Sequence, residues 1–125
     1  MRIDRSRSPL VVLKPNGFNP KAEQFEAYLR NFEQLFEAEK GRLYLLFDLT
    51  EAVAIDLAHL RKQIAFGKKM EATFRDRVRC TAIVLTNPIL RGLINVVFAV
   101  APPVRPYTTV SNFDAGVKWL HESKI

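Results

Sequence analysis

Apolar residues follow one another without interruption from Leu43 to Phe47, in a stretch that reads R-L-Y-L-L-F-D-L-T over residues 42–50. A strand without alternation of apolar and polar residues is typical of the middle of a parallel or mixed sheet, where other elements cover both faces. We therefore expect this stretch to be the central strand of the fold. Its polar side chains come only at its carboxyl end, where open α/β sheets usually carry their binding sites, so Asp48 and Thr50 are the first candidate site residues.

Further apolar runs predict four more strands, and apolar residues at three- and four-residue steps predict four helices. The expected strands cover residues 1–4, 9–14, 78–86 and 107–110, and residues 5–8 are expected to connect the first two as a hairpin. The expected helices cover 21–40, the region between Thr50 and Phe74, 89–101, and the residues after a cap at Ser111 or Asn112. Gly67 is expected to bend or restart the second helix.

The order of these elements is two strands, then helix and strand in alternation to a closing helix. Such alternation implies a mostly parallel sheet with right-handed crossovers and helices on its faces. The chain has 125 residues, of which 48% are apolar, and this suits one domain with one real core. We predict a single α/β domain over residues 1–125, with a sheet of four or five strands, an N-terminal β-hairpin and about four helices.

Composition and spacing argue against several classes of protein. No apolar run reaches the ~20 residues that a membrane-spanning helix needs, and the first residues lack the apolar core of a signal peptide, so we expect a soluble, cytoplasmic protein. Cys80 stands alone, which excludes an internal disulfide, and it is expected to be a buried structural thiol. His59 and His121 lie far apart, and no phosphate-binding glycine loop or nucleophile elbow is present. We therefore expect no metal, no cofactor and no enzymatic activity.

The formal charge of +6 is concentrated between residues 61 and 79, where seven basic residues stand against Glu71 and Asp76. The basic residues are Arg61, Lys62, Lys68, Lys69, Arg75, Arg77 and Arg79. One interpretation is a solvated helix face that keeps the protein soluble, and the other is a patch that contacts anionic lipid headgroups or nucleic acid. Because these residues lack the stacking aromatics that single-strand binders use, the pattern argues against nucleic acid.

The expected helix at 89–101 differs from the others because apolar residues lie on both of its sides. Its inner face can meet the sheet, while Ile89, Val96 and Val100 point away from the sheet, with Arg91 on the rim. An exposed apolar helix face marks an interaction site unless another element covers it. We predict that these four residues form a self-association face or a lipid-contacting face. The alternative is that the first or last helix covers them.

Four stretches carry a family resemblance through their order and spacing. They are L-V-V-L at 10–13 with Gly17 after it, L-L-F-D-L-T at 45–50, V-R-C-T-A-I-V at 78–84 and F-D-A-G-V-K-W-L at 113–120. In this order they resemble the strand and glycine that precede the first helix, the central strand with its acidic end, the following strand and the closing helix of the STAS fold, specifically of the SpoIIAA-like proteins grouped with it. The resemblance covers nearly the whole chain.

The resemblance implies a small regulatory or binding module without chemistry of its own. In classical STAS members a kinase phosphorylates a serine that follows an aspartate at the start of the helix after the central strand, and this controls partner binding. The matching place here is Asp56, followed by Leu57, Ala58 and His59, so the acceptor hydroxyl is missing and Asp56 is expected as a helix-start acid. Thr50 is the nearest hydroxyl to the strand end, and it is expected either as a loop or N-cap hydroxyl or as a phosphorylation site.

Three functions are consistent with these observations. The first is a non-catalytic regulatory or interaction module that binds a protein partner or itself, as a homodimer. The second is a carrier or sensor of an apolar ligand held between sheet and helix near Phe66, Phe74 and Phe98, because SpoIIAA-like proteins are also similar in fold to lipid-carrying CRAL-TRIO domains. The third is contact of segment 61–79 with an anionic membrane or nucleic acid.

Overall fold

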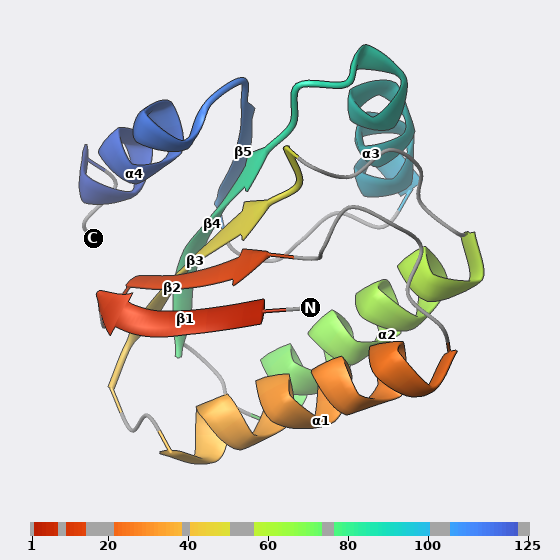
Figure 1. Cartoon of the computed structure of the whole chain (residues 1–125), viewed down its shortest axis with the longest axis vertical. Coiled ribbons are helices and arrows are strands. Elements are labelled where there is room, and N and C mark those ends of the chain that lie inside the picture. The colour runs from red at the N-terminus through yellow and green to blue at the C-terminus, as the bar shows by residue number, and fades with distance from the viewer. Residues whose placement is uncertain are drawn as a thin grey trace.

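Five strands and four helices follow one another in the order that the sequence predicts (Figure 1). The computed structural model describes residues 2–7, 10–14, 22–38, 41–50, 57–73, 77–100 and 106–122. The strands are β1 (Arg2–Arg7), β2 (Leu10–Lys14), β3 (Leu43–Asp48), β4 (Val78–Val84) and β5 (Tyr107–Val110). The helices are α1 (Ala22–Ala38), α2 (Leu57–Thr73), α3 (Pro88–Val100) and α4 (Phe113–Glu122).

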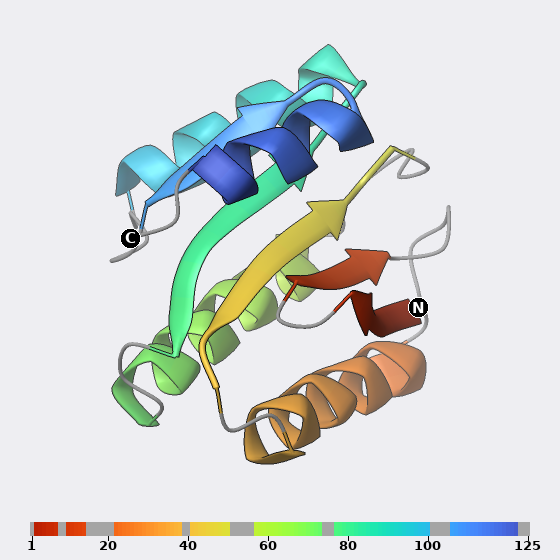
Figure 2. The same cartoon turned by 90° about the vertical axis from the view of Figure 1, so that its left-hand side faces the viewer.

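The strands form one sheet in the order β1-β2-β3-β4-β5, so the apolar strand β3 is its centre, as predicted. β1 and β2 pair antiparallel as the expected hairpin, and every other neighbouring pair is parallel. Each crossover moves one strand further in the same direction. Right-handed crossovers of this kind put their helices on one face, so α1, α2 and α3 share a face and α4 covers the other (Figures 1 and 2). The predicted α/β class is confirmed.

Aromatic side chains fill the core between the sheet and the helices α1 and α2. Phe32 of α1 is 3% exposed and stacks on Phe36 with ring centroids 5.5 Å apart. Its ring also meets Phe66 of α2 at 5.1 Å and Phe47 of β3 at 6.1 Å. Tyr28 is buried in the same cluster, and loss of solvent raises the pKa of its hydroxyl well above the usual value. Phe32 therefore joins both helices to the central strand.

Of the four described helices, α4 packs against the other face of the sheet. Leu46 and Cys80 are fully buried there, in a cluster with Leu120 of α4. Burial raises the pKa of the Cys80 thiol, which fits the predicted structural role. Gly116 lets the helix approach the strands closely, because a Cβ atom there would lie 3.1 Å from Leu46 Cδ1. Asn112, one of the two predicted caps, accepts a hydrogen bond from Ala115 N at 2.8 Å.

Two local predictions are wrong. β1 continues to Arg7, which pairs with Leu10, so residues 5–7 belong to the strand and not to the connection. The pairing register shifts between Asp4 and Arg7, which lets the strand continue through these polar residues. α2 runs through Gly67 without a break. Packing of the buried Phe66 and Met70 on the core outweighs the low helix propensity of one glycine.

Substitution of two glycines should test the close packing of α4. Gly116→Val should lower the free energy of unfolding by about 1–3 kcal/mol, because the added methyl groups overpack the contact with Leu46. Gly67→Ala is the control, since nothing lies within 4 Å of its Cβ position, and it should raise that free energy by about 0.5–1 kcal/mol. Urea unfolding measures both, and a Gly116→Val protein as stable as wild type would contradict the packing described.

Candidate functional site

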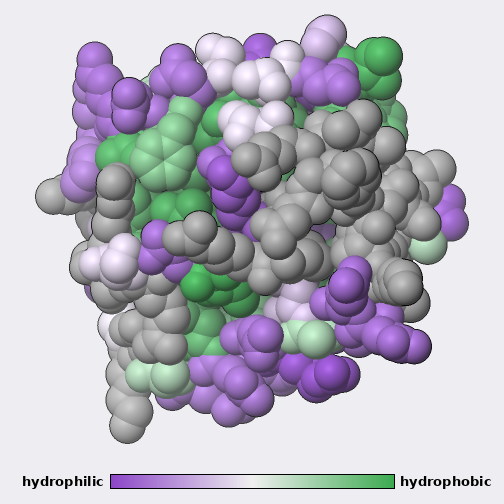
Figure 3. Space-filling view, in the orientation of Figure 1, coloured by the Kyte–Doolittle hydropathy of each residue, from purple (hydrophilic) through white to green (hydrophobic). Residues whose placement is uncertain are grey.

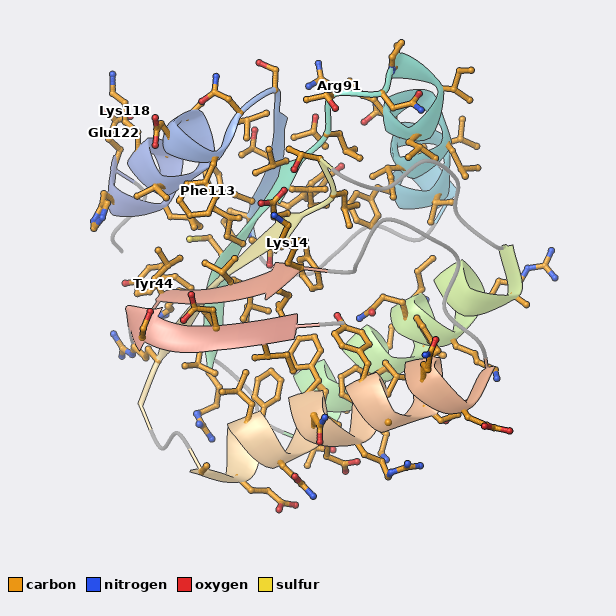
Figure 4. The ribbon with its side chains drawn as sticks, viewed as in Figure 1. Lys14, Tyr44, Arg91, Phe113, Lys118 and Glu122 are labelled. Carbon is orange, nitrogen blue, oxygen red and sulfur yellow. The ribbon has the colours of Figure 1, made fainter. Side chains whose placement is uncertain are left out.

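The predicted strand-end residues Asp48 and Thr50 lie together at the carboxyl edge of the sheet. Asp48 is 7% exposed, and its Oδ1 accepts hydrogen bonds from the backbone N of Thr50 at 3.1 Å and from its hydroxyl at 2.6 Å. Parallel pairing of β2 with β3 brings Lys14 to the same edge, where its Nζ lies 3.9 Å from Asp48 Oδ2 (Figure 4). Both carboxylate oxygens therefore face donors.

This arrangement anchors the chain where it leaves β3. Asp48 satisfies a backbone donor, as the sequence predicts, and its partners hold it in one orientation. The hydroxyl of Thr50 has a structural partner, because it donates a hydrogen bond to Asp48. A phosphate on Thr50 would replace the donated hydrogen bond by repulsion from the Asp48 carboxylate. The third predicted residue of this group, Asp56, lies outside the described residues.

The Asp48 anchor can be tested by substitution. Asp48→Ala should lower the free energy of unfolding by about 1–3 kcal/mol, because it leaves two donors of Thr50 without their acceptor. Asp48→Asn retains an acceptor oxygen and should cost less. The matched control Lys14→Met should cost less than about 1 kcal/mol, since that ion pair is long and partly exposed. Equal costs for the three variants in chemical denaturation would contradict this assignment.

The outer side of α3 exposes apolar residues, as predicted. Asn87 caps the helix by accepting hydrogen bonds from Ile89 N at 2.9 Å and Leu90 N at 3.4 Å. Leu90 is buried against the sheet, but Ile89 is 80% exposed and Val96 is 63% exposed. This exposure shows that neither α1 nor α4 covers them, and Figure 3 shows hydrophobic atoms at the upper right, over α3. Of Val100, the structure describes the backbone alone.

Two small residues complete this exposed surface. Gly92 and Ala99 are exposed and follow Ile89 and Val96 at helical spacing. We call Ile89, Gly92, Val96 and Ala99 the outer stripe. Arg91 lies elsewhere on the helix: its Nη2 donates a hydrogen bond to Leu85 O at 3.1 Å, so the guanidinium turns back toward the end of β4 (Figure 4).

Some residues of the predicted basic segment form ion pairs, and others are exposed. Lys62 of α2 binds Glu26 of α1 at 2.9 Å, and Lys69 binds Glu33 at 3.5 Å. Both pairs join residues 36 positions apart, so the parallel helices lie side by side in register. Arg61 and Lys68 are exposed, while Arg77 donates through Nε to Gly41 O at 2.9 Å. Arg79 is partly buried, and Arg75 lies outside the described residues.

These pairs reduce the positive potential that an anionic surface would meet, because two of the α2 lysines are already matched by carboxylates. Anion contact through this segment stays a prediction.

A hollow on the α4 side of the sheet was not predicted. α4 packs over β3, β4 and β5, while Figure 1 shows no helix over the β1–β2 hairpin on this face. Figure 3 shows hydrophobic atoms at the floor of a hollow between α4 and the hairpin. Half-buried Tyr44 and Phe113 belong to the apolar cluster there, and Lys14 lies at the rim (Figure 4). The unbroken apolar pattern of β3 is the signal that could have suggested an apolar surface here.

The aromatic residues predicted to hold an apolar ligand are separated by the fold. Phe66 packs on Phe32 in the cluster under α1 and α2, whereas Phe98 of α3 meets Tyr107 of β5 edge to face at 4.7 Å. Phe74 lies outside the described residues. The rings of Phe66 and Phe98 thus fill two different parts of the core.

Within the described part of the chain, no three His, Cys, Asp or Glu residues come together as metal ligands would. His121 is exposed in the last turn of α4. None of the described helices combines the length and the apolar character that crossing a bilayer requires.

Comparison with known proteins supports the fold. One solved structure similar to this chain is that of an uncharacterized protein of the DUF3478 family, with a SpoIIAA-like fold, from Shewanella loihica PV-4. The TM-score is 0.69, and the match covers 95% of this chain and 90% of that chain at 17% sequence identity. No protein-family model matches the chain, and no curated protein matches it. The chain has a SpoIIAA-like fold, as its sequence motifs predict.

Proposed function

We propose that this SpoIIAA-like domain is a non-catalytic interaction module that binds a protein partner through the outer stripe of α3, and that it acts in the cytoplasm. The observation that carries the proposal is the exposure of Ile89 and Val96 on a helix whose other side packs against the sheet through Leu90 and Ile94. Burial of one such side chain contributes about 1.5–3 kcal/mol, so a partner helix or sheet would gain from covering the stripe.

The strand-end residues support a binding role over a catalytic one. The Asp48 carboxylate is already engaged within the fold: Oδ1 accepts both hydrogen bonds of Thr50, and Oδ2 lies 3.9 Å from Lys14 Nζ. Cys80, the one cysteine of the sequence, is buried, and burial raises the pKa of its thiol. In the outer stripe, by contrast, Ile89 and Val96 remain exposed.

Photo-cross-linking should test binding through α3. A photo-reactive phenylalanine analogue at Val96, introduced in cells that express the protein, should give covalent protein adducts, whereas the same group at exposed Ala65 of α2 should give few. Adding Ile89→Asp should abolish the Val96 adducts, because a carboxylate would have to be buried in the contact. Equal adduct yields from Val96 and Ala65 would contradict the proposal.

A second candidate function, binding of an apolar small molecule, is favoured by the hollow beside α4. Its floor is apolar, Tyr44 and Phe113 are half-buried beside it, and the ammonium of Lys14 stands at the rim, where it could meet an anionic head group. This place lies on the opposite face of the sheet from Phe66 and Phe98. It is therefore a different site from the one that the sequence suggested.

Titration with a dansyl-labelled fatty acid should separate the two candidates. If the hollow binds apolar ligands, Phe113→Asp should weaken binding of the probe about tenfold or more, because it removes a large apolar contact. Val96→Asp, far from the hollow on α3, should leave the probe affinity unchanged. Native mass spectrometry of the purified protein checks for a bound molecule. Equal effects of both variants on probe affinity would show that the probe does not bind in the hollow.

A further inference from the structure

The outer stripe repeats with the spacing of a helix-pairing seam. Its residues follow one another at steps of three, four and three, the spacing of a and d positions in a coiled coil. Large and small side chains alternate along it: Ile89, then Gly92, then Val96, then Ala99. Nothing lies within 4 Å of a Cβ position at Gly92, so the space beside it is open. The stripe is thus a row of projections and gaps.

An antiparallel pair of α3 helices matches every projection with a gap. With the two-fold axis level with Ile94, Ile89 of one copy faces Ala99 of the other, and Gly92 faces Val96. The same two contacts recur by symmetry on the other side of the axis, as a two-fold interface requires. A parallel pair would instead place Val96 against Val96 and Gly92 against Gly92, which leaves a void between the two glycines.

The absence of charge on the outer stripe allows a second copy to be the occupant. The chain carries a formal charge of +6, so two copies repel one another over much of their surface. α3 holds a single charged residue, Arg91, and that guanidinium turns back to Leu85 O. The stripe itself is uncharged, so it offers no charged group for an acidic or basic partner to recognise, and two copies can meet there with little repulsion.

We propose that the outer stripe of α3 binds the outer stripe of a second copy of this chain, antiparallel about a two-fold axis. This inference rests on the proposed interaction function and names its partner. α3 has 13 residues and is about 20 Å long. A contact of one such helix pair falls below the roughly 1,200–2,000 Å² of a standard interface, so the dimer should be weak, with a dissociation constant in the micromolar range or above.

Sedimentation equilibrium over a range of concentrations tests the pairing. The wild type should shift from 14.3 kDa toward twice that mass as its concentration rises. Gly92→Leu should abolish the shift by filling the gap that receives Val96, although it makes the surface more apolar. The swap G92V/V96G exchanges projection and gap and should restore association. Leucine has a higher helix propensity than glycine, and the Cβ position of Gly92 is open, so unfolding of Gly92→Leu would not explain a loss of association.

Cysteine cross-linking tests the direction of the pair. Antiparallel pairing predicts that Gly92→Cys and Val96→Cys proteins cross-link when mixed, and that each alone does not. Native Cys80 is buried and should not compete. Cross-links of each variant with itself would overturn the antiparallel arrangement.

If Gly92→Leu associated more strongly than wild type, the proposed fit of Val96 into the gap at Gly92 would be wrong. A wild type that stays monomeric at millimolar concentration would overturn self-pairing. In that case Val96 adducts with other proteins would leave the proposed interaction function standing, whereas loss of all Val96 adducts would remove both.

Discussion

Burial of β3 on both faces is the constraint on which the rest of the structure depends. Leu43, Leu45 and Leu46 are almost without solvent contact, so helices must cover both faces of the sheet at this strand. Three right-handed crossovers supply α1, α2 and α3 to one face, and the chain after β5 supplies α4 to the other. Phe32 fills the space between α1, α2 and the sheet, and Gly116 lets α4 approach the strands closely on the other face.

The exposed stripe of α3 follows from the same topology. α3 connects β4 to β5, and β5 is the last strand of the sheet, so α3 lies at the end of the helical layer. α1 and α2 pair with each other through Glu26 with Lys62 and Glu33 with Lys69. A helix at the end of the layer needs only one apolar side to cover the sheet, but α3 is apolar on both sides. The second apolar side serves no contact within the described part of the chain, which is why we connect it with binding.

Polar residues at the strand ends serve mainly to anchor loops and helix starts. Asp48 holds Thr50, Asn87 caps α3 and Asn112 caps α4. Each supplies an oxygen to backbone donors that the secondary structure leaves without partners. This use explains why acidic and amide residues gather at the carboxyl edge of the sheet. The hollow beside α4 and the outer stripe are the surfaces that such anchoring leaves open.

The sequence by itself determined the order of elements, the central place of β3 and the two-sided apolar pattern of α3, because uninterrupted apolar runs and helical periodicity are local signals of burial. Tertiary structure decided the rest. The continuity of α2 at Gly67 came from packing of its neighbours, and the separation of Phe66 from Phe98 came from the positions of two helices along the sheet. Lys62 pairs with Glu26, which is far away in the sequence, and Arg91 reaches Leu85 O because of how the chain turns between β4 and α3. No local sequence pattern encodes either contact. The hollow beside α4 exists because one helix covers part of a five-stranded face, and only the arrangement of whole elements fixes that.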